Sequence, residues 1–190
     1  MSKQRQSAVV TGSSRGIARA IAEQLAADGV AVAINYACSP QEADEAVRGI
    51  VERGGRAIAI QADISIPGDV RRLFDEAEKF SGPPDIVVAN AGAFPRKPIT
   101  QSTEEDCEDA FNANKKGVFV TLREAGKRVN EGGRIVAVSS GARKMPWAGA
   151  SLYLGGKRAI EQFARSLSRE LGPRFIAVNV LSSDSRILSK

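Results

Sequence analysis

Tyr153 and Lys157 stand four residues apart, at the start of a segment with helical spacing that runs to Leu171. Residues with this spacing share one face of a helix, with Cβ atoms about 5–6 Å apart. An unperturbed tyrosine, with a pKa of about 10, is a poor acid catalyst at neutral pH, but a neighbouring ammonium favours the phenolate and lowers that pKa. The pair therefore indicates proton transfer by Tyr153, although an isolated Tyr-x-x-x-Lys is more often an ordinary pair on a helix surface.

Two further polar positions accompany this pair. Ser140 follows an apolar run at residues 135–138 and precedes Tyr153 by thirteen residues. A hydroxyl there can donate a hydrogen bond to a substrate oxygen and stabilise developing negative charge. Asn114 opens the segment Asn-Lys-Lys-Gly-Val-Phe, residues 114–119. The sequence contains no histidine, which excludes Ser-His hydrolase chemistry, histidine-ligated zinc and a histidine base.

A glycine-rich segment, Thr-Gly-Ser-Ser-Arg-Gly-Ile-Ala at residues 11–18, lies between an apolar run and a helical pattern. Gly12 permits a tight turn, and Gly16 lets the backbone approach a pyrophosphate whose charge the helix N-terminus stabilises. The segment predicts a dinucleotide site that includes Gly12, Ser13, Ser14, Arg15, Gly16 and Ile17. Taken alone, it is also compatible with a helix-start turn that happens to contain two glycines.

The order of these motifs resembles the short-chain dehydrogenase/reductase family from about Ser7 to Leu181. The family's glycine loop reads TGxxxGxG, and Ala18 here stands in place of the third glycine. The resemblance implies hydride transfer between a nicotinamide cofactor and a carbonyl or secondary alcohol, of the 3-oxoacyl or small-ketone reductase type. It also implies a small-molecule substrate and a catalytic set made of Asn114, Ser140, Tyr153 and Lys157.

Within that set, the resemblance implies a distinct role for each residue. Ser140 polarises the substrate carbonyl, and Tyr153 supplies the proton. Lys157 lowers the pKa of Tyr153 and also holds the nicotinamide ribose. Asn114 fixes a water molecule that relays protons to Lys157.

The expected cofactor is NADP(H) rather than NAD(H). NAD-selective sites usually carry an acid after the second strand, whereas residues 35–39 read Asn-Tyr-Ala-Cys-Ser. Arg15 can pair with a 2′-phosphate, and Ser39 matches the small polar residue that assists in similar reductases; a solvent-facing Arg15 is the alternative. The resemblance adds further cofactor positions at Asp63, Ile64, Asn90, Ala91 and Gly92. Asn90 is equally suited to tying the sheet together.

Six short apolar runs alternate with longer segments of helical spacing, a pattern typical of parallel strands covered on both faces. The runs are residues 8–10, 30–34, 57–60, 86–89, 135–138 and 175–181. They predict a doubly wound, Rossmann-like α/β sheet of six parallel strands with helices on both faces. In the first helical segment, Ile17, Ile21 and Leu25 recur at four-residue steps. No repeat or linker interrupts residues 1–190, which predicts a single dinucleotide-binding domain.

Composition narrows the function classes. The chain has 190 residues, 43% of them apolar, and its net charge of +5 favours anionic ligands. The basic residues are scattered, so we do not expect nucleic-acid binding. The only cysteines, Cys38 and Cys107, are far apart in sequence, which argues against a disulfide or a metal site and fits a reducing cytoplasm. No apolar stretch has the length of about 18 residues that a membrane span requires.

The family pattern stops near the end of the sequence. Val178 and Asn179 match the start of the family's V-N-x-x-x-P-G segment, but Ser183 and Asp184 stand at its Pro and Gly positions. Residues 182–190 depart from the family pattern, and they supply neither the substrate loop nor the seventh strand of similar proteins. We expect the sixth strand to be an exposed edge and the substrate pocket to lack one wall. The alternative function is therefore a truncated, catalytically impaired relative that binds NADP(H) or a sister subunit without turnover.

Two expectations concern surfaces around the site. Residues 93–100 and 141–150, including Trp147, are candidates for the substrate pocket. Similar proteins pair through the helices that precede the fifth strand and follow Tyr153. Both helices are expected here, so the chain should form a homo-oligomer, either a dimer or a tetramer.

Overall fold

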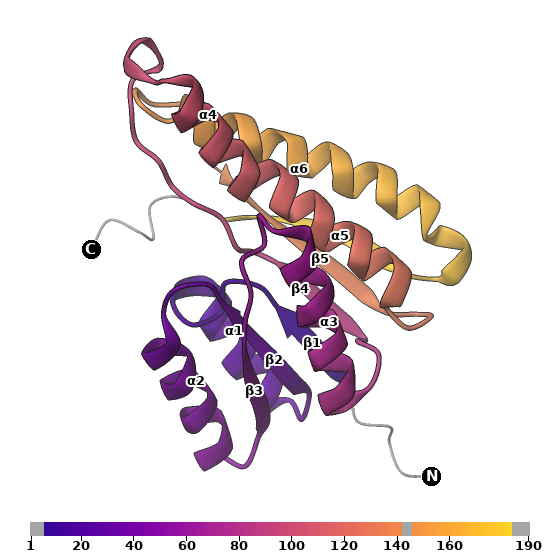
Figure 1. The fold of residues 1–190 in the computed structure, drawn as a ribbon. Helices are drawn as coiled ribbons and strands as arrows, with labels where there is room; N and C mark the ends of the chain where they lie inside the picture. The colour runs from indigo at the N-terminus through magenta and orange to yellow at the C-terminus, as the bar shows by residue number, and fades with distance from the viewer. Residues whose placement is uncertain (1–5, 142–145, 184–190) are drawn as a thin grey trace.

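The structure is a computed structural model that describes residues 6–141 and 146–183. Helices and strands alternate along the chain (Figure 1). The strands are β1 (Ser7–Val10), β2 (Ala31–Tyr36), β3 (Arg56–Gln61), β4 (Ile86–Ala89), β5 (Arg134–Ser140) and β6 (Ala177–Ser183). The α-helices are α1 (Gly16–Ala27), α2 (Pro40–Glu52), α3 (Pro67–Ser81), α4 (Glu104–Phe111), α5 (Gly117–Arg128) and α6 (Ser151–Glu170). Residues 142–145 of the expected substrate loop and 184–190 of the departing C-terminal segment lie outside the described residues.

The strands form one parallel sheet in the order β3-β2-β1-β4-β5-β6. The expected Rossmann-like sheet is therefore confirmed. Its order reverses between β1 and β4, the place where open α/β sheets bind ligands. The edge strand β6 starts at Ala177 rather than at the expected Phe175. Residues 172–174 form a 3-10 turn, and Phe175 adopts a left-handed backbone with φ of 57°.

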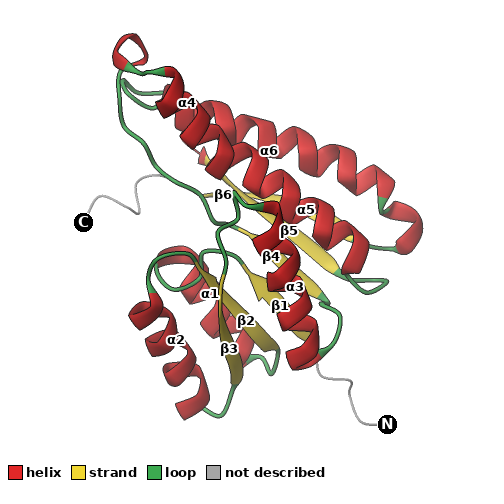
Figure 2. Cartoon of the chain, viewed as in Figure 1, coloured by secondary structure: helices red, strands yellow, loops and turns green. Residues whose placement is uncertain are grey.

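Helices cover the two faces of the sheet unequally (Figure 2). One core packs α3, α5 and α6 against one face, and its members include Phe74, Val118 and Ile160. The other core packs α1 and α2 against the opposite face. Because both faces of the central strands are buried, β1 and β4 are almost wholly apolar. None of the helices in the described part of the chain is long and apolar enough to cross a membrane.

Helix α1 buries a different stripe from the one that its largest apolar residues suggest. Ala18, Ala22 and Ala26 face the sheet and are buried, whereas Ile17, Ile21 and Leu25 are only half-buried. Alanine side chains let the helix axis approach the sheet closely, and Ile21 and Leu25 then pack along the side of the same core. This close seating brings the first turn of α1 beside the carboxyl ends of β1 and β2.

Candidate active site

A cavity of about 570 Å³ lies along the carboxyl ends of the strands. Most of the residues that the sequence predicted for cofactor and catalysis line it: Gly12, Ser14, Arg15, Gly16, Ile17, Ser39, Asp63, Ile64, Asn90, Ala91, Gly92, Tyr153 and Lys157. The predicted residues Ser13, Asn114 and Ser140 do not line it and are buried instead. The fold thus gathers positions spread from residue 12 to residue 157 along one crevice.

The glycine loop requires its first glycine for two reasons. Gly12 has a left-handed φ of 64°, and a Cβ at this position would lie 2.9 Å from the Ala91 Cα. A side chain would therefore be strained and would collide with the loop that follows β4. Helix α1 begins at Gly16, and its N-cap residue, Arg15, makes no side-chain capping bond. The first-turn amides remain available to an anion, as in known phosphate sites.

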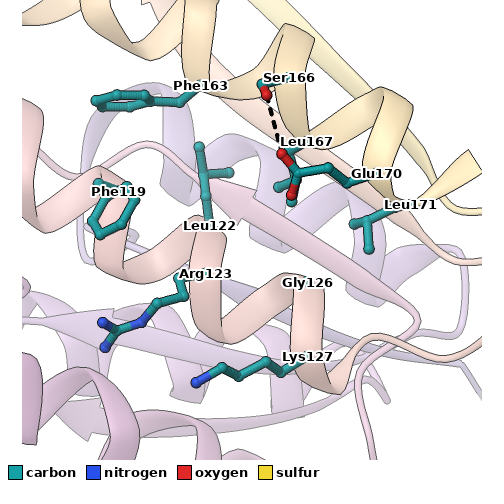
Figure 3. Close-up of a pocket in the computed structure, with 10 residues that line it drawn as sticks. All are labelled: Phe119, Leu122, Arg123, Gly126, Lys127, Phe163, Ser166, Leu167, Glu170 and Leu171. Atoms are coloured by element: carbon teal, nitrogen blue, oxygen red, sulfur yellow. Dashed lines mark hydrogen bonds between the residues drawn. The ribbon is translucent and has the colours of Figure 1, made fainter.

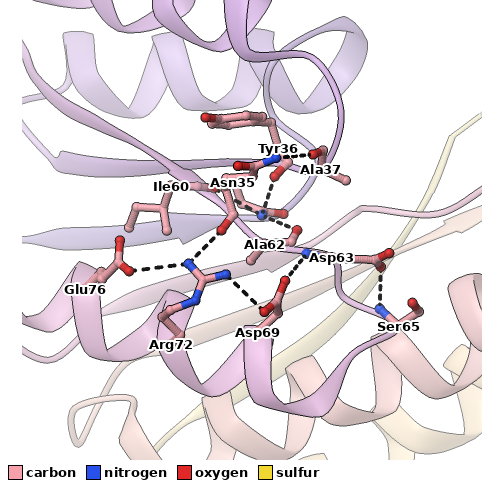
Figure 4. A network of polar contacts seen from close by, with 11 residues as sticks. Asn35, Tyr36, Ala37, Ile60, Ala62, Asp63, Ser65, Asp69, Arg72 and Glu76 are labelled. Atoms are coloured by element: carbon pink, nitrogen blue, oxygen red, sulfur yellow. Dashed lines mark hydrogen bonds and ion pairs between the residues drawn. The ribbon is translucent and has the colours of Figure 1, made fainter.

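Asn35, at the end of β2, holds this loop in place and was missed by the sequence reasoning. It is 1% exposed, and its Oδ1 accepts a hydrogen bond from the Gly12 amide at 3.1 Å. Its Nδ2 donates to the Ala62 carbonyl at 2.9 Å, beyond the end of β3 (Figure 4). In the sequence, Asn35 is distinguished only as the single polar residue directly after the apolar run at residues 30–34.

Ser13, which is buried, makes further hydrogen bonds between the glycine loop and the strands β1 and β2. Its amide donates to the Asn35 carbonyl at 2.9 Å, and its hydroxyl donates to the Val10 carbonyl at 2.7 Å. The Asn35 amide in turn donates to the Ser13 hydroxyl oxygen at 3.2 Å. Ser13 therefore joins β1 to β2 below the loop, while its neighbour Ser14 lines the cavity.

Asp63 lies on an exposed turn that α3 stabilises. Its amide donates to Asp69 Oδ2 at 3.0 Å, and its own Oδ1 accepts from the Ser65 amide at 2.8 Å (Figure 4). Arg72 pairs with Asp69 at 3.0 Å and donates to the Gln61 carbonyl at 2.8 Å. The hydrogen bond from the Asp63 amide, followed by that from Arg72, lowers the pKa of Asp69. These contacts fix the wall of the cavity beyond β3.

Asn90 joins the ends of β4 and β1. The Thr11 hydroxyl oxygen accepts hydrogen bonds from the amides of Asn90, at 3.0 Å, and Ala91, at 3.1 Å. Asn90 Nδ2 donates to the Thr11 carbonyl at 3.3 Å. The Asn90 side chain thus ties the sheet together, although the residue also lines the cavity.

Tyr153 and Lys157 lie on the first turns of α6, and the lysine is 5% exposed. Lys157 Nζ donates to the Val138 carbonyl at 3.0 Å and lies 5.8 Å from the centre of the Tyr153 ring. Burial lowers the pKa of Lys157 to about 8. The rings of Phe94 and Tyr153 form a T-shaped contact with a centroid distance of 4.6 Å, and the centroid of the Trp147 ring lies 6.1 Å from that of Phe94. An aromatic wall therefore adjoins the tyrosine.

Asn114 lies in a π-helical turn, Asn112–Lys116, between α4 and α5. Single π-turns of this kind often accompany functional sites. The Asn114 Oδ1 accepts from the Ala93 amide at 3.0 Å, and its Nδ2 donates to the Ala93 carbonyl at 2.8 Å. A Cβ on Gly156 would lie 2.8 Å from the Asn114 Cβ. The glycine therefore allows α6 to pack directly against this turn.

Ser139 and Ser140 end β5 at the same edge. Ser139 lines the cavity, and its hydroxyl donates to the Glu161 carboxylate at 3.1 Å. Ser140 is 4% exposed. Within residues 6–141 and 146–183, no group of three or more His, Cys, Asp or Glu side chains is placed to hold a metal ion.

The cavity can therefore accommodate an elongated anionic ligand. Helix-start amides and Arg15 lie at one part of the cavity, and Tyr153, Lys157 and Phe94 lie at another. A phenol beside a buried ammonium is suited to exchanging a proton with a bound oxygen.

Known proteins resemble this chain in both sequence and fold. The profile of the family described as short chain dehydrogenase matches residues 6–183. A hydroxynaphthalene reductase-like protein, Arp2 of Metarhizium majus, is 42% identical over 92% of this chain and 66% of its own length. A short-chain dehydrogenase from Burkholderia cenocepacia, solved with NADP, is 42% identical, with a TM-score of 0.90 over 95% of this chain and 74% of that one.

A third similar protein carries a ligand besides the cofactor. The landomycin C-6 ketoreductase LanV, solved with NADP and rabelomycin, is 37% identical, with a TM-score of 0.89 over 93% of this chain and 75% of that one. The chain spans 71% of the length of one similar curated protein and 66% of the length of another.

Proposed function

The chain belongs to the short-chain dehydrogenase/reductase family and takes NADP(H) as its cofactor, and from this premise we propose that it catalyses the reversible reduction of a carbonyl to a secondary alcohol. NADPH, when bound, supplies the hydride that adds to the carbonyl carbon. The observation that carries the proposal is the position of Tyr153 beside the buried ammonium of Lys157, in a cavity that the glycine loop also lines.

The residues present fit this cofactor. The absence of a side chain at Gly12 lets the glycine loop pack closely against Ala91. The amides at the start of α1 have no side-chain cap and can bind a phosphate. Arg15 and Lys157 are the cations among the residues lining the cavity. We assign Arg15 and Ser39 to the 2′-phosphate, Gly12 to Ile17 to the pyrophosphate, and Asp63 with Ile64 to the adenine.

Each catalytic residue then has a defined task. Tyr153 donates its phenolic proton to the carbonyl oxygen, and the Lys157 ammonium stabilises the phenolate that this step leaves. Ser140 donates a hydrogen bond to the same oxygen, which stabilises its developing charge. Lys157 also holds the nicotinamide ribose, and Asn114 positions a water molecule that returns a proton toward Lys157.

The substrate assigned from the sequence is a 3-oxoacyl compound or a small ketone. Phe94 lines the cavity beside Tyr153 and is in ring contact with Trp147, which favours a second class of substrate, ketones with a flat apolar ring system. Ring stacking and edge contacts with such a substrate add stability beyond the apolar area buried. The names of the hydroxynaphthalene reductase-like protein Arp2 and of the ketoreductase LanV, which was solved with rabelomycin, are consistent with this class.

The groove between α5 and α6 supports a homo-oligomer (Figure 3). It has a volume of about 400 Å³, and its rim presents the rings of Phe119 and Phe163 at a centroid distance of 5.6 Å. Phe119 is 44% exposed in the isolated chain. A second copy that packs α5 and α6 against the same helices would remove this apolar surface from water.

The alternative, a relative that binds NADP(H) without turnover, is separated by one experiment. NADPH binding is measured by the change in its fluorescence, and NADPH consumption is followed in parallel with a panel of β-keto esters, diketones and aromatic ketones. Binding together with consumption supports the reductase. Binding without consumption for every ketone supports the alternative instead.

A further inference from the structure

Arg15 has a neighbour whose charge opposes its assigned ligand. Glu42 lies in the first turn of α2, and its Oε2 is 3.8 Å from Arg15 NH1. This separation makes an ion pair without a hydrogen bond. The arginine side chain is 74% exposed, so it is held only weakly and can reorient toward a ligand.

The Glu42 carboxylate is incompletely satisfied. Its Oε2, the atom that faces Arg15, is shielded from solvent and accepts no hydrogen bond. A desolvated carboxylate oxygen without a donor is unfavourable. A 2′-phosphate held by Arg15 would bring further negative charge close to this carboxylate, whereas a 2′-hydroxyl would not.

We propose that Glu42 is a specificity-determining residue that opposes the selectivity of Arg15 for NADP(H) over NAD(H). In the free protein Glu42 competes with the 2′-phosphate for Arg15. In the complex its negative charge repels that phosphate, whereas the 2′-hydroxyl of NADH, which carries no charge, is not repelled. The inference rests on the assignment of the 2′-phosphate to Arg15 in the proposed function.

The charges around Arg15 determine whether Glu42 raises or lowers the preference for NADPH over NADH. Arg15 and Ser39 favour the 2′-phosphate, and Glu42 is the acid that the structure pairs with Arg15. Removing its charge leaves the arginine free for the phosphate and removes the repulsion between the carboxylate and the phosphate. The chain should therefore prefer NADPH over NADH less strongly than it would if Arg15 had no acidic neighbour.

The test compares dissociation constants for NADPH and NADH, measured by quenching of Trp147, the single tryptophan in the chain. In Glu42→Gln, the ratio of the NADH constant to the NADPH constant should rise about 1.5- to fivefold, the range expected for an ion pair at the protein surface. The gain should shrink as salt is added. Glu45→Gln is the matched control, because Glu45 is an exposed acid on the same helix; it should leave the ratio unchanged.

A third variant separates the two claims. Arg15→Gln should lower the ratio, because it removes the cation assigned to the 2′-phosphate. If Arg15→Gln lowers the ratio but Glu42→Gln changes it no more than Glu45→Gln does, the role of Glu42 is wrong and the cofactor assignment stands. If Arg15→Gln leaves the ratio unchanged, the assignment of Arg15 fails, and the inference about Glu42 fails with it.

Discussion

The side-chain amide of Asn114 makes two hydrogen bonds with the backbone of Ala93, one from the Ala93 amide and one to its carbonyl. These bonds connect the π-helical turn before α5 to the loop that follows β4. That loop lines the cavity through Gly92, Ala93 and Phe94. Asn114 therefore has a positional task that is visible in the structure, in addition to the water-holding role that we propose.

Replacement of Asn114 by alanine should release this loop. Both backbone groups of Ala93 lose their partner, which costs about 1–3 kcal/mol of unfolding free energy. NADPH binding should weaken as the loop loses its position. Urea denaturation and cofactor titration measure the two effects, with Asn112→Ala in the same π-turn as the control. Equal behaviour of the two variants would contradict this account.

Two adjacent glycines in α6 should respond in opposite directions to alanine. A Cβ on Gly156 would lie 2.8 Å from the Asn114 Cβ, whereas a Cβ on Gly155 would meet only Phe111, at 3.7 Å. Gly156→Ala should destabilise the chain by about 1–3 kcal/mol through overpacking. Gly155→Ala should stabilise it by about 0.5–1 kcal/mol, because alanine is the better helix former. Thermal unfolding of the two variants provides the comparison, and destabilisation of similar size in both would refute the close contact.

Burial of Lys157 should make the stability depend on pH. Its pKa is lowered from 10.5 to about 8 in the folded chain. Between these values the unfolded chain binds more protons than the folded chain, so the free energy of unfolding rises with pH. The rise attributable to Lys157 is at most about 3 kcal/mol. Below about pH 8 both states are protonated, and this contribution becomes constant.

Urea unfolding at pH 7, 8.5 and 10 measures this contribution. The free energy of unfolding of the wild type, minus that of Lys157→Met, should rise over the interval. The exposed Lys116 supplies the control, since Lys116→Met should keep the pH profile of the wild type. Parallel profiles for wild type and Lys157→Met would show that the lysine is not desolvated.

If the chain forms an oligomer through the apolar groove between α5 and α6, a charged residue placed in that groove should weaken the assembly. Phe119→Asp places a carboxylate on the rim of the groove between α5 and α6 and should shift the assembly toward the monomer at micromolar concentration. Phe175→Asp is the control, because Phe175 is 80% exposed and lies outside this groove. Sedimentation velocity reports the mass. A monomeric wild type, or an assembly that Phe119→Asp leaves intact, would contradict the proposed interface.

The sheet could be predicted from the sequence because each buried parallel strand is a short apolar run between helix-stop residues. The departures have physical causes. Phe175 is apolar, so the sequence pattern predicts it to be in the strand, but it adopts a left-handed backbone conformation in the preceding turn. The periodicity of apolar residues contains no information about that conformation. In α1, alanines rather than the larger residues face the sheet, because a close helix–sheet contact selects for small volume.

The site could be predicted only as far as its motifs extend. Tyr153, Lys157 and the glycine loop have spacings that identify them, and they line one cavity. Asn35 and the Ala93 partner of Asn114 could not be identified, because their roles depend on backbone groups brought together by the fold. The pairing of Arg15 with Glu42 likewise joins the starts of α1 and α2, which are distant in sequence.

NADPH consumption by wild type and Tyr153→Phe, with a ketone that the wild type reduces, tests the central claim most directly. Tyr36→Phe is the matched control, because Tyr36 is the only other tyrosine and lines the same cavity. Tyr153→Phe should lose at least about 100-fold in turnover through loss of general acid catalysis, while NADPH still binds and Tyr36→Phe retains activity. Turnover by Tyr153→Phe equal to that of the wild type would contradict the assignment of Tyr153 as the proton donor.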